Sequence, residues 1–242
     1  MNSNNTNWAK LLSNAHLHVG LHTIKLKDLL ALREKENFHR DIVTTFPSIT
    51  IGSITLVDQI VLLCLDELLK PSAVLEIGTF QGYTTRLLVK NSSAKTIYTV
   101  DLPSVEQSIL LSPDTEKVLS DGDYNDDYLR DIQNKSGEIY LQDLDVVEMQ
   151  RVKLIKQDST AIDFNRSFQG VNFVFIDGGH HYDIVRSDTE KSLSIVDQGV
   201  IIWHDFASGI HSDVTRYLNE RAISNQIFHV NGSLCAFQLV GF

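Results

Sequence analysis

The chain has 242 residues, of which 43% are hydrophobic and 21% are charged. This length and composition predict one large globular domain, with or without an appended segment, and exclude a disordered chain. The net charge of −10 argues against nucleic acid and anionic membrane surfaces as partners, because both require clustered basic residues. Two scattered cysteines, Cys64 and Cys235, supply neither a disulfide framework nor the spacing of a zinc site.

The first eight residues, Met1 to Trp8, are polar and rich in Asn. They lack the basic and apolar regions of a signal peptide, so a cytoplasmic location is expected. No run of about 18 apolar residues occurs along the chain, so a membrane span is not expected either.

Residues 1–54 are predicted to form an N-terminal helical segment, in which residues 25–32 show the spacing of a helix. From residue 55 to residue 69 apolar side chains again recur at helical intervals, and Pro71 ends that pattern. Residues 55–242 are predicted to form the main domain.

From residue 73 short apolar runs alternate with helical stretches. Residues 73–77 and 96–100 predict buried strands, and residues 83–90 between them predict a helix. Three further strands are expected at residues 152–155, 171–176 and 199–203. Because helices separate these strands, as at residues 182–196, the pattern predicts an α/β protein with a mostly parallel sheet.

The C-terminus predicts two more strands, at residues 226–230 and 233–240, with Asn231-Gly232 between them. Asn-Gly is a strong hairpin signal, so these two strands are expected to be antiparallel. The predicted fold is therefore α/β, Rossmann-like and doubly wound. It has a mostly parallel seven-stranded sheet with a C-terminal antiparallel hairpin and an N-terminal helical segment.

Residues 104–150 separate two predicted strands by more than the usual crossover, and we interpret them as an acidic insertion. Residues 114–148 within it hold eleven acidic and three basic side chains, a local charge of −8. One interpretation is a solvated surface insertion, which is the common behaviour of acidic runs. The other is a lid over the substrate, because long loops in compact domains are often functional.

The turn after the first core strand gives the most specific functional signal. Gly78 and Gly82 have the spacing G-x-x-x-G, and Gly82 opens a helix whose N-terminus favours a carboxylate or phosphate. A dinucleotide fold needs glycine where Phe80 stands, and no Gly-Lys-Ser/Thr of a P-loop follows, so both nucleotide classes are disfavoured. Asp101 ends the next strand, 23 positions after Gly78, where an acid can accept both ribose hydroxyls of an adenosine.

This turn resembles the first motif of class I S-adenosylmethionine-dependent methyltransferases, especially small-molecule O-methyltransferases of the catechol type; its sequence is Leu75-Glu76-Ile77-Gly78-Thr79-Phe80-Gln81-Gly82-Tyr83-Thr84. The resemblance implies S-adenosylmethionine as cofactor, with its methionine part in the turn, its carboxylate at Thr84 and its ribose on Asp101. Asp158 and Ser159 would flank the adenine. The cofactor-binding residues implied in this way are Glu76, Gly78, Thr79, Gly82, Tyr83, Thr84, Asp101, Asp158, Ser159 and Asp177.

Polar side chains also follow two later strands at the carboxyl edge of the predicted sheet. Asp177 and His180 follow one strand, and His204 and Asp205 follow the next. Oxygen ligands suit a hard cation such as Mg²⁺, whereas His ligands shift the preference toward transition metals. A His with a pKa near neutrality can also act as a general base. His211 has no motif context and is expected to be structural or on the surface.

The segment from Asp177 to Phe206 is similar to a bacterial group of sugar and macrolide O-methyltransferases from natural-product pathways, the family 24-like methyltransferases. The resemblance implies that Asp177 and two acids at positions 204 and 205 bind Mg²⁺, with His180 as the base. This chain has His204 instead of a carboxylate, which implies weaker Mg²⁺ binding or none. We therefore predict His180 and Asp177 as catalytic residues, and Asp177, His204 and Asp205 as metal ligands.

These motifs predict a methyltransferase that acts on a hydroxyl group of a small molecule or sugar, and that forms a homodimer through its N-terminal helices. Methylation of a nitrogen atom, or of a glycoconjugate, is an alternative with the same fold. A second alternative is a metal-dependent hydrolase that uses Asp177, His180, His204 and Asp205. A third is a nucleotide-binding module without catalysis.

Overall fold

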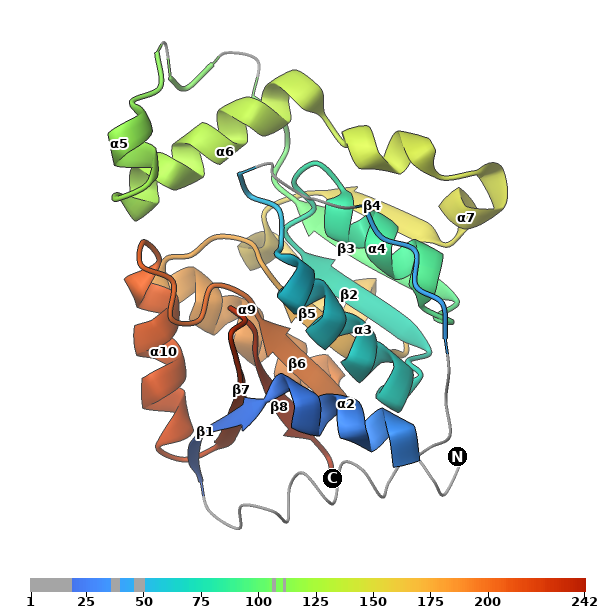
Figure 1. Cartoon of the computed structure of the whole chain (residues 1–242). Helices are drawn as coiled ribbons and strands as arrows, with labels where there is room; N and C mark the ends of the chain where they lie inside the picture. Colours follow the sequence, from blue (N-terminus) through green and yellow to red (C-terminus); the bar gives the residue numbers. More distant parts are fainter. Residues whose placement is uncertain (1–18, 36–39, 46–50, 106–107, 111) are drawn as a thin grey trace.

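The computed structural model describes residues 19–35, 40–45, 51–105, 108–110 and 112–242. They are built around one mixed sheet of eight strands, in the order β1-β7-β8-β6-β5-β2-β3-β4 (Figure 1). The polar residues 1–8 lie outside the described part of the chain. Within the described ranges, no helix is long and apolar enough to cross a membrane.

Five parallel strands form the part of the sheet that holds the candidate site. They are β2 (Ala73–Ile77), β3 (Thr96–Asp101), β4 (Val152–Lys156), β5 (Val171–Ile176) and β6 (Gly199–Trp203). The sequence predicted all five. β2 and β6 are buried along their whole length, which explains why both are continuous apolar runs rather than alternating ones.

The C-terminal hairpin is confirmed. β7 (Gln226–Asn231) and β8 (Ala236–Val240) are antiparallel, and β8 also pairs antiparallel with β6. Gly232 follows β7 with a φ of +85°, a conformation that glycine adopts without strain.

The N-terminal segment differs from the prediction. Its helix is present as α2 (Leu26–Lys35), but the preceding residues form an additional strand, β1 (Gly20–Lys25). β1 pairs in parallel with β7 along its whole length, so the sheet has eight strands instead of seven. Its six residues show no strong alternation of apolar and polar side chains. They form a strand because β7 offers a free edge with which they can pair.

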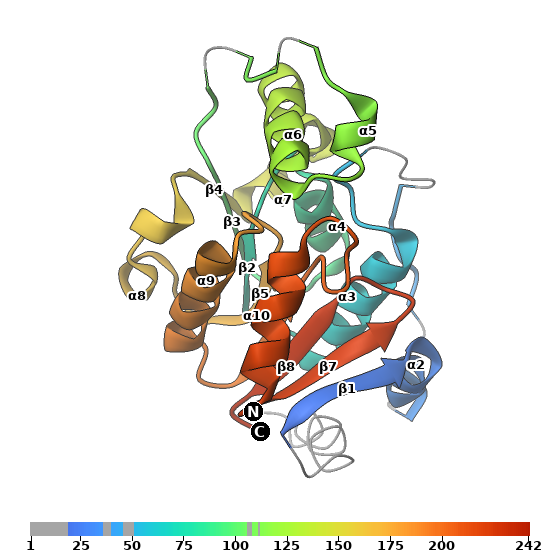
Figure 2. The ribbon, with the colours of Figure 1, turned by 90° about the vertical axis from the view of Figure 1, so that its left-hand side faces the viewer.

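Helices cover both faces of the sheet and enclose two apolar cores (Figure 2). On one face lie α2, α3 (Leu56–Leu69) and α4 (Tyr83–Asn91); on the other lie α8 (Phe164–Ser167), α9 (Tyr182–Ile195) and α10 (Ser212–Ala222). Thr55 caps α3 and forms a capping box with Asp58, which explains where this helix begins.

The acidic insertion is folded. It contains α5 (Thr115–Val118), α6 (Gly122–Ser136), the 3₁₀ helix η1 (Ile139–Asp143) and α7 (Val146–Gln150). In Figure 1, α5 and α6 lie above the sheet. Contacts from α6 to Asp101 and His180 place this helix over the carboxyl ends of the parallel strands.

Candidate active site

The turn from β2 to α4 is tightly enclosed. Gly78 has a φ of +105°, and a Cβ added to it would lie 1.9 Å from the carbonyl oxygen of Asp177. Gly82 has a φ of +83° and begins α4, and its Cβ would lie 2.7 Å from Leu141 Cγ. Both glycines are therefore required by backbone conformation and by close approach of neighbours.

Glu76 supports this turn from below. Its carboxylate accepts hydrogen bonds from Thr85 and from Thr99 Oγ1 (2.6 Å), and no part of its side chain is exposed. Burial raises the pKa of Glu76 to about 8, against the opposing effect of the two threonines. Glu76 thus ties β2 to α4 and β3 through Oε2, while its Oε1 has no hydrogen-bond partner among the described residues, and its contact with the cofactor stays a prediction.

Three other predicted residues of the turn are also buried. Thr79 Oγ1 lies 2.6 Å from Thr99 Oγ1, and Tyr83 donates a hydrogen bond to the Thr45 carbonyl at 2.9 Å. Thr84 lies in the first turn of α4 and is 7% exposed. The turn therefore presents mainly its backbone to a ligand.

Asp101 lies beside the turn, as predicted. Its Oδ2 accepts hydrogen bonds from Phe80 N (3.0 Å) and Gln133 Nε2 (3.2 Å), and Lys156 Nζ lies 3.5 Å away. Burial raises the pKa of Asp101, and the charge of Lys156 opposes this. The link to Phe80 joins the end of β3 to the glycine turn.

The predicted adenine residues lie on the next loop. Gln157 N donates to the carbonyl of Asp101 at 2.8 Å, so the loop that holds Asp158 and Ser159 adjoins the end of β3. Asp158 caps its own short 3₁₀ turn by accepting from Thr160 N, and hydrogen bonds from the Thr160 hydroxyl and from Thr160 N lower the pKa of Asp158. Ser159 is buried.

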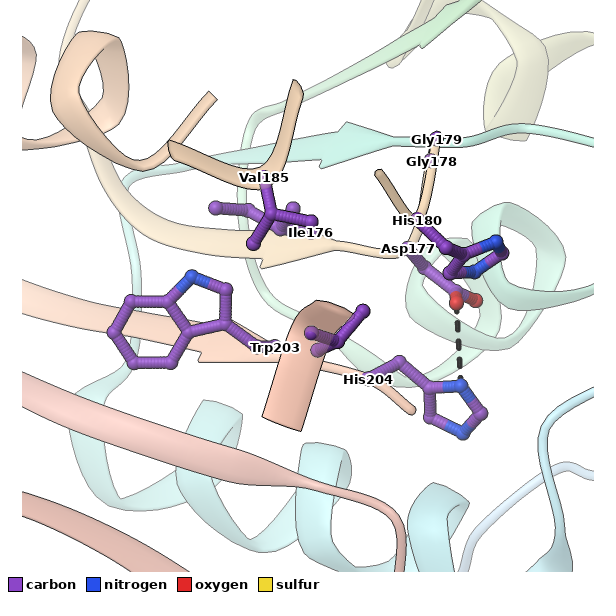
Figure 3. Close-up of a pocket in the computed structure, with 9 residues that line it drawn as sticks. Ile176, Asp177, Gly178, Gly179, His180, Val185, Trp203 and His204 are labelled. Carbon is purple, nitrogen blue, oxygen red and sulfur yellow. Dashed lines mark ion pairs between the residues drawn. The ribbon is translucent and has the colours of Figure 1, made fainter. Parts of the chain in front are cut away.

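A second group of residues converges at the ends of β5 and β6 (Figure 3). His204 Nδ1 lies 3.2 Å from Asp177 Oδ1 and 3.1 Å from Asp205 Oδ2, and its Nε2 lies 3.4 Å from Asp58 Oδ2. Burial by itself would lower the pKa of His204, but the three carboxylates more than offset it and hold this pKa well above its usual range. The structure thus unites the three predicted metal ligands.

His180 lies between two carboxylates. Its Nδ1 is 2.8 Å from Asp126 Oδ1 and its Nε2 is 3.1 Å from Asp205 Oδ2. Burial opposes protonation, yet hydrogen bonds to these acids raise the pKa of His180 to about 10. In this arrangement His180 keeps its proton at neutral pH, and it can act as a base only after one carboxylate is engaged elsewhere.

The structure places His211 in the interior, which agrees with one of the two expectations for it, a structural histidine. It is buried and stacks on His180 with ring centroids 3.8 Å apart. Burial and the charge of His180 lower the pKa of His211. By contrast, His181 is largely exposed and lies 3.6 Å from Asp123, on the surface beside the site.

The sequence patterns did not identify Asp58, Asp126 or His211 as site residues. Asp126 belongs to α6, 54 positions from His180, and Asp58 belongs to α3. No local motif marks any of them. The one available signal was the charge of the acidic insertion, and the helix at its centre does cover the site.

The donor set at Asp177, His204 and Asp205 fits a divalent cation. One atom from each residue can be chosen so that all three lie within 4.8 Å of one another. The cavity next to them measures only about 10 Å³, which is the space of one water-sized sphere (Figure 3). One nitrogen and two carboxylate oxygens are ligands that borderline metals accept more readily than Mg²⁺ does.

Comparison with known proteins places this geometry in a family. A family model described as a methyltransferase domain matches residues 75–206, more than half of the chain. No curated protein matches the chain in sequence.

Solved structures share the fold at low sequence identity. The cofactor-bound protein Rv0187 from MTB is 15% identical over 89% of each chain, with a TM-score of 0.53. The SAH-bound methyltransferase PaMTH1 from Podospora anserina is 13% identical over 99% of this chain and 96% of its own, with a TM-score of 0.53. The O-methyltransferase TomG from Streptomyces achromogenes is 14% identical over 100% of both chains, with a TM-score of 0.50.

These structures confirm the Rossmann-like α/β fold predicted from the sequence. The family model covers the glycine turn, Asp101 and both strand ends that supply the site. The chain therefore belongs to the methyltransferase domain family, as its motifs predicted.

Proposed function

We propose that this protein transfers the methyl group of S-adenosylmethionine to a hydroxyl oxygen of a small molecule or sugar. The observation that supports this most directly is the position of the glycine turn. The Cβ position of Gly78 lies against the carbonyl of Asp177, so the cofactor turn and the acid–histidine cluster share one edge of the sheet. PaMTH1 is described as SAH-bound and TomG as a SAM-bound O-methyltransferase, which supports the cofactor and the oxygen acceptor.

The residues have distinct roles in this proposal. The backbone of the turn and the N-terminus of α4 receive the methionine part, because helix N-termini favour carboxylates. Asp101 accepts hydrogen bonds from the ribose hydroxyls, which replace part of its contacts with Gln133 and Lys156. Asp158 and Ser159 lie beside the adenine.

The acceptor hydroxyl takes the place of Asp126 on His180 Nδ1. Loss of that carboxylate lowers the pKa of His180 toward the range of a general base, and the Nδ1 proton is released to solvent before the reaction. The acceptor oxygen then attacks the methyl carbon, the carbon–sulfur bond breaks, S-adenosylhomocysteine leaves, and the hydroxyl proton passes to His180. Alignment of this kind contributes about 7–11 kcal/mol of barrier reduction in favourable cases.

Asp177, His204 and Asp205 would hold a divalent cation, whose chemistry is to orient the acceptor hydroxyl and increase its acidity. The Asp177 carbonyl also limits the space at Gly78, because a Cβ there would lie 1.9 Å from it.

The experiment that tests the proposal is calorimetric titration of the purified protein with S-adenosylhomocysteine. Micromolar binding is expected, and Asp101→Ala should weaken it 10-fold or more, about 1.4 kcal/mol per decade. Asp163→Ala is the control, because Asp163 is likewise an Asp whose carboxylate accepts a backbone hydrogen bond, but it does so from Arg166 N at the start of α8. A folded wild-type protein that does not bind this ligand would refute the cofactor assignment, and an unchanged affinity in Asp101→Ala would remove Asp101 from the site.

Methylation of nitrogen or of a glycoconjugate differs only in the acceptor and is tested by product analysis. Family membership disfavours the metal-dependent hydrolase. The cytoplasmic location, the homodimer and a role in natural-product synthesis stay predictions.

A further inference from the structure

The cluster around His204 extends beyond the residues that the family model matches. Asp58 lies on α3, outside residues 75–206, yet its carboxylate faces the ring of His204. It is fully buried, and Oδ2 accepts from Thr55 N (3.0 Å) while Oδ1 accepts from Leu234 N (2.8 Å). Asp58 is thus held by α3 and the C-terminal hairpin in a fixed position behind His204.

We propose that Asp58 positions His204 as a nitrogen ligand, and that the site at Asp177, His204 and Asp205 binds Mn²⁺ in preference to Mg²⁺. Only the role of the cation in catalysis depends on the proposed function. Binding of the cation and the role of Asp58 are separate properties of the apoprotein.

The first argument is the spacing of the donor atoms. Nδ1 of His204 lies 3.2 Å from Asp177 Oδ1 and 3.1 Å from Asp205 Oδ2. Adjacent ligands of an octahedral ion with bonds of about 2.1 Å are roughly 3 Å apart. With all three donor atoms also within 4.8 Å of one another, these two distances allow the side chains to bind one small divalent cation.

The second argument is the orientation of the imidazole. A metal-binding histidine usually directs its other ring nitrogen to a carboxylate, which fixes the tautomer and the ring plane. In this structure Nε2 of His204 faces Asp58 at 3.4 Å, while Nδ1 faces the two other acids. His204 Nε2 is fully buried and has no hydrogen bond among the described residues, so its contact with Asp58 at 3.4 Å is an ion pair.

The third argument is charge. Four carboxylates contact the two histidines of the site: Asp58, Asp126, Asp177 and Asp205. Even if both imidazoles are protonated, two negative charges remain, and buried charge is costly unless it is paired. A divalent cation offsets this excess.

The fourth argument concerns the type of metal. Mg²⁺ prefers oxygen ligands in near-ideal octahedral geometry, and His204 replaces one of the oxygens. Imidazole nitrogen together with carboxylates suits metals of the Mn²⁺ to Zn²⁺ series better. Among these, Mn²⁺ is the one that carboxylate and water ligands also suit.

The test is titration of the full-length apoprotein with Mn²⁺ and with Mg²⁺, followed by calorimetry and by loss of the free Mn²⁺ paramagnetic resonance signal. Wild type is expected to bind Mn²⁺ at least 10-fold more tightly than Mg²⁺. Asp58→Asn should weaken Mn²⁺ binding by about 10- to 100-fold, as expected for removal of such a partner. His204→Asp leaves Asp58 unchanged and should shift the metal preference of the site from Mn²⁺ toward Mg²⁺.

Glu148→Gln is the matched control, because Glu148 occupies the same capping-box position in α7 that Asp58 occupies in α3. It should leave Mn²⁺ affinity unchanged. The proposal is overturned if wild type binds no Mn²⁺, if Mg²⁺ binds as tightly, or if Asp58→Asn and Glu148→Gln behave alike. Titration with S-adenosylhomocysteine in parallel separates this failure from failure of the proposed function.

Discussion

At the scale of the residue, the protonation state of His180 decides whether it can act as a general base. Asp126 and Asp205 hold its two ring nitrogens from opposite sides, one from the acidic insertion and one from the end of β6. Asp205 is itself held by two histidines, which keep its pKa well below the usual range although burial opposes this. Asp126 is the more exposed of the two acids, so it is the one that an acceptor hydroxyl can displace.

Asp126→Asn should therefore lower the pKa of His180 from about 10 by roughly one pH unit or more, because one of its two anionic partners is lost. The measurement is a proton NMR titration of the histidine ring signals. Asp123→Asn is the matched control, since Asp123 lies on the same helix but contacts His181. Equal His180 titration in both variants would contradict the pairing with Asp126.

At the scale of the element, the turn between β2 and α4 depends on close backbone packing. Gly78 N donates to Val100 O at 2.8 Å, and Asp177 N donates to Ile77 O at 2.8 Å, so three strand ends are joined around the turn. Leu141 of η1 covers Gly82 from the other side. The insertion and the glycine turn thus form one packed unit, in agreement with a covering role for the insertion.

Gly78→Ala should destabilise the protein by more than Gly137→Ala does. Both glycines have positive φ, but a Cβ at Gly137 meets nothing within 4 Å, whereas at Gly78 it meets the Asp177 backbone. Backbone strain by itself costs about 1–3 kcal/mol, and the clash adds to this at Gly78. Chemical denaturation of both variants measures the difference, and equal losses of stability would show that the close approach is relieved in solution.

At the scale of the whole molecule, the buried acids and histidines link stability to pH. The pKa of His180 is about 10 in the folded protein, above its ordinary value of 6.5, because Asp126 and Asp205 outweigh burial. The contribution of His180 to the free energy of unfolding is complete below pH 6.5, where this residue is protonated in both the folded and the unfolded chain. Between pH 6.5 and about 10 only the folded chain keeps the proton, so this contribution is lost as pH rises.

Between pH 6.5 and about 10, deprotonation of His180 should therefore lower the free energy of unfolding of the wild type by up to about 1.4 kcal/mol per pH unit. His180→Gln should show a shallower decline, because it has no proton to lose. Free energies of unfolding from urea titrations at several pH values between 6.5 and 10 measure both slopes. Parallel curves for the two proteins would mean that His180 does not hold a raised pKa.

The local sequence determined much of this protein. The short apolar runs specified the five parallel strands and the hairpin; β2 and β6 are buried along their whole length, and strands buried on both faces must be largely apolar. The glycine spacing specified the turn. The acids at the strand ends specified which residues meet at the carboxyl edge, since parallel strands all end there.

The tertiary structure decided the rest. β1 is a strand because β7 offers it an edge, and Glu76 is a buried support because α4 and β3 bring threonines to it. Asp58, Asp126 and His211 reach the site from α3, the insertion and the N-cap of α10. Such contacts join residues far apart in sequence, and no local period or motif encodes them, because only the packed chain brings their charges together.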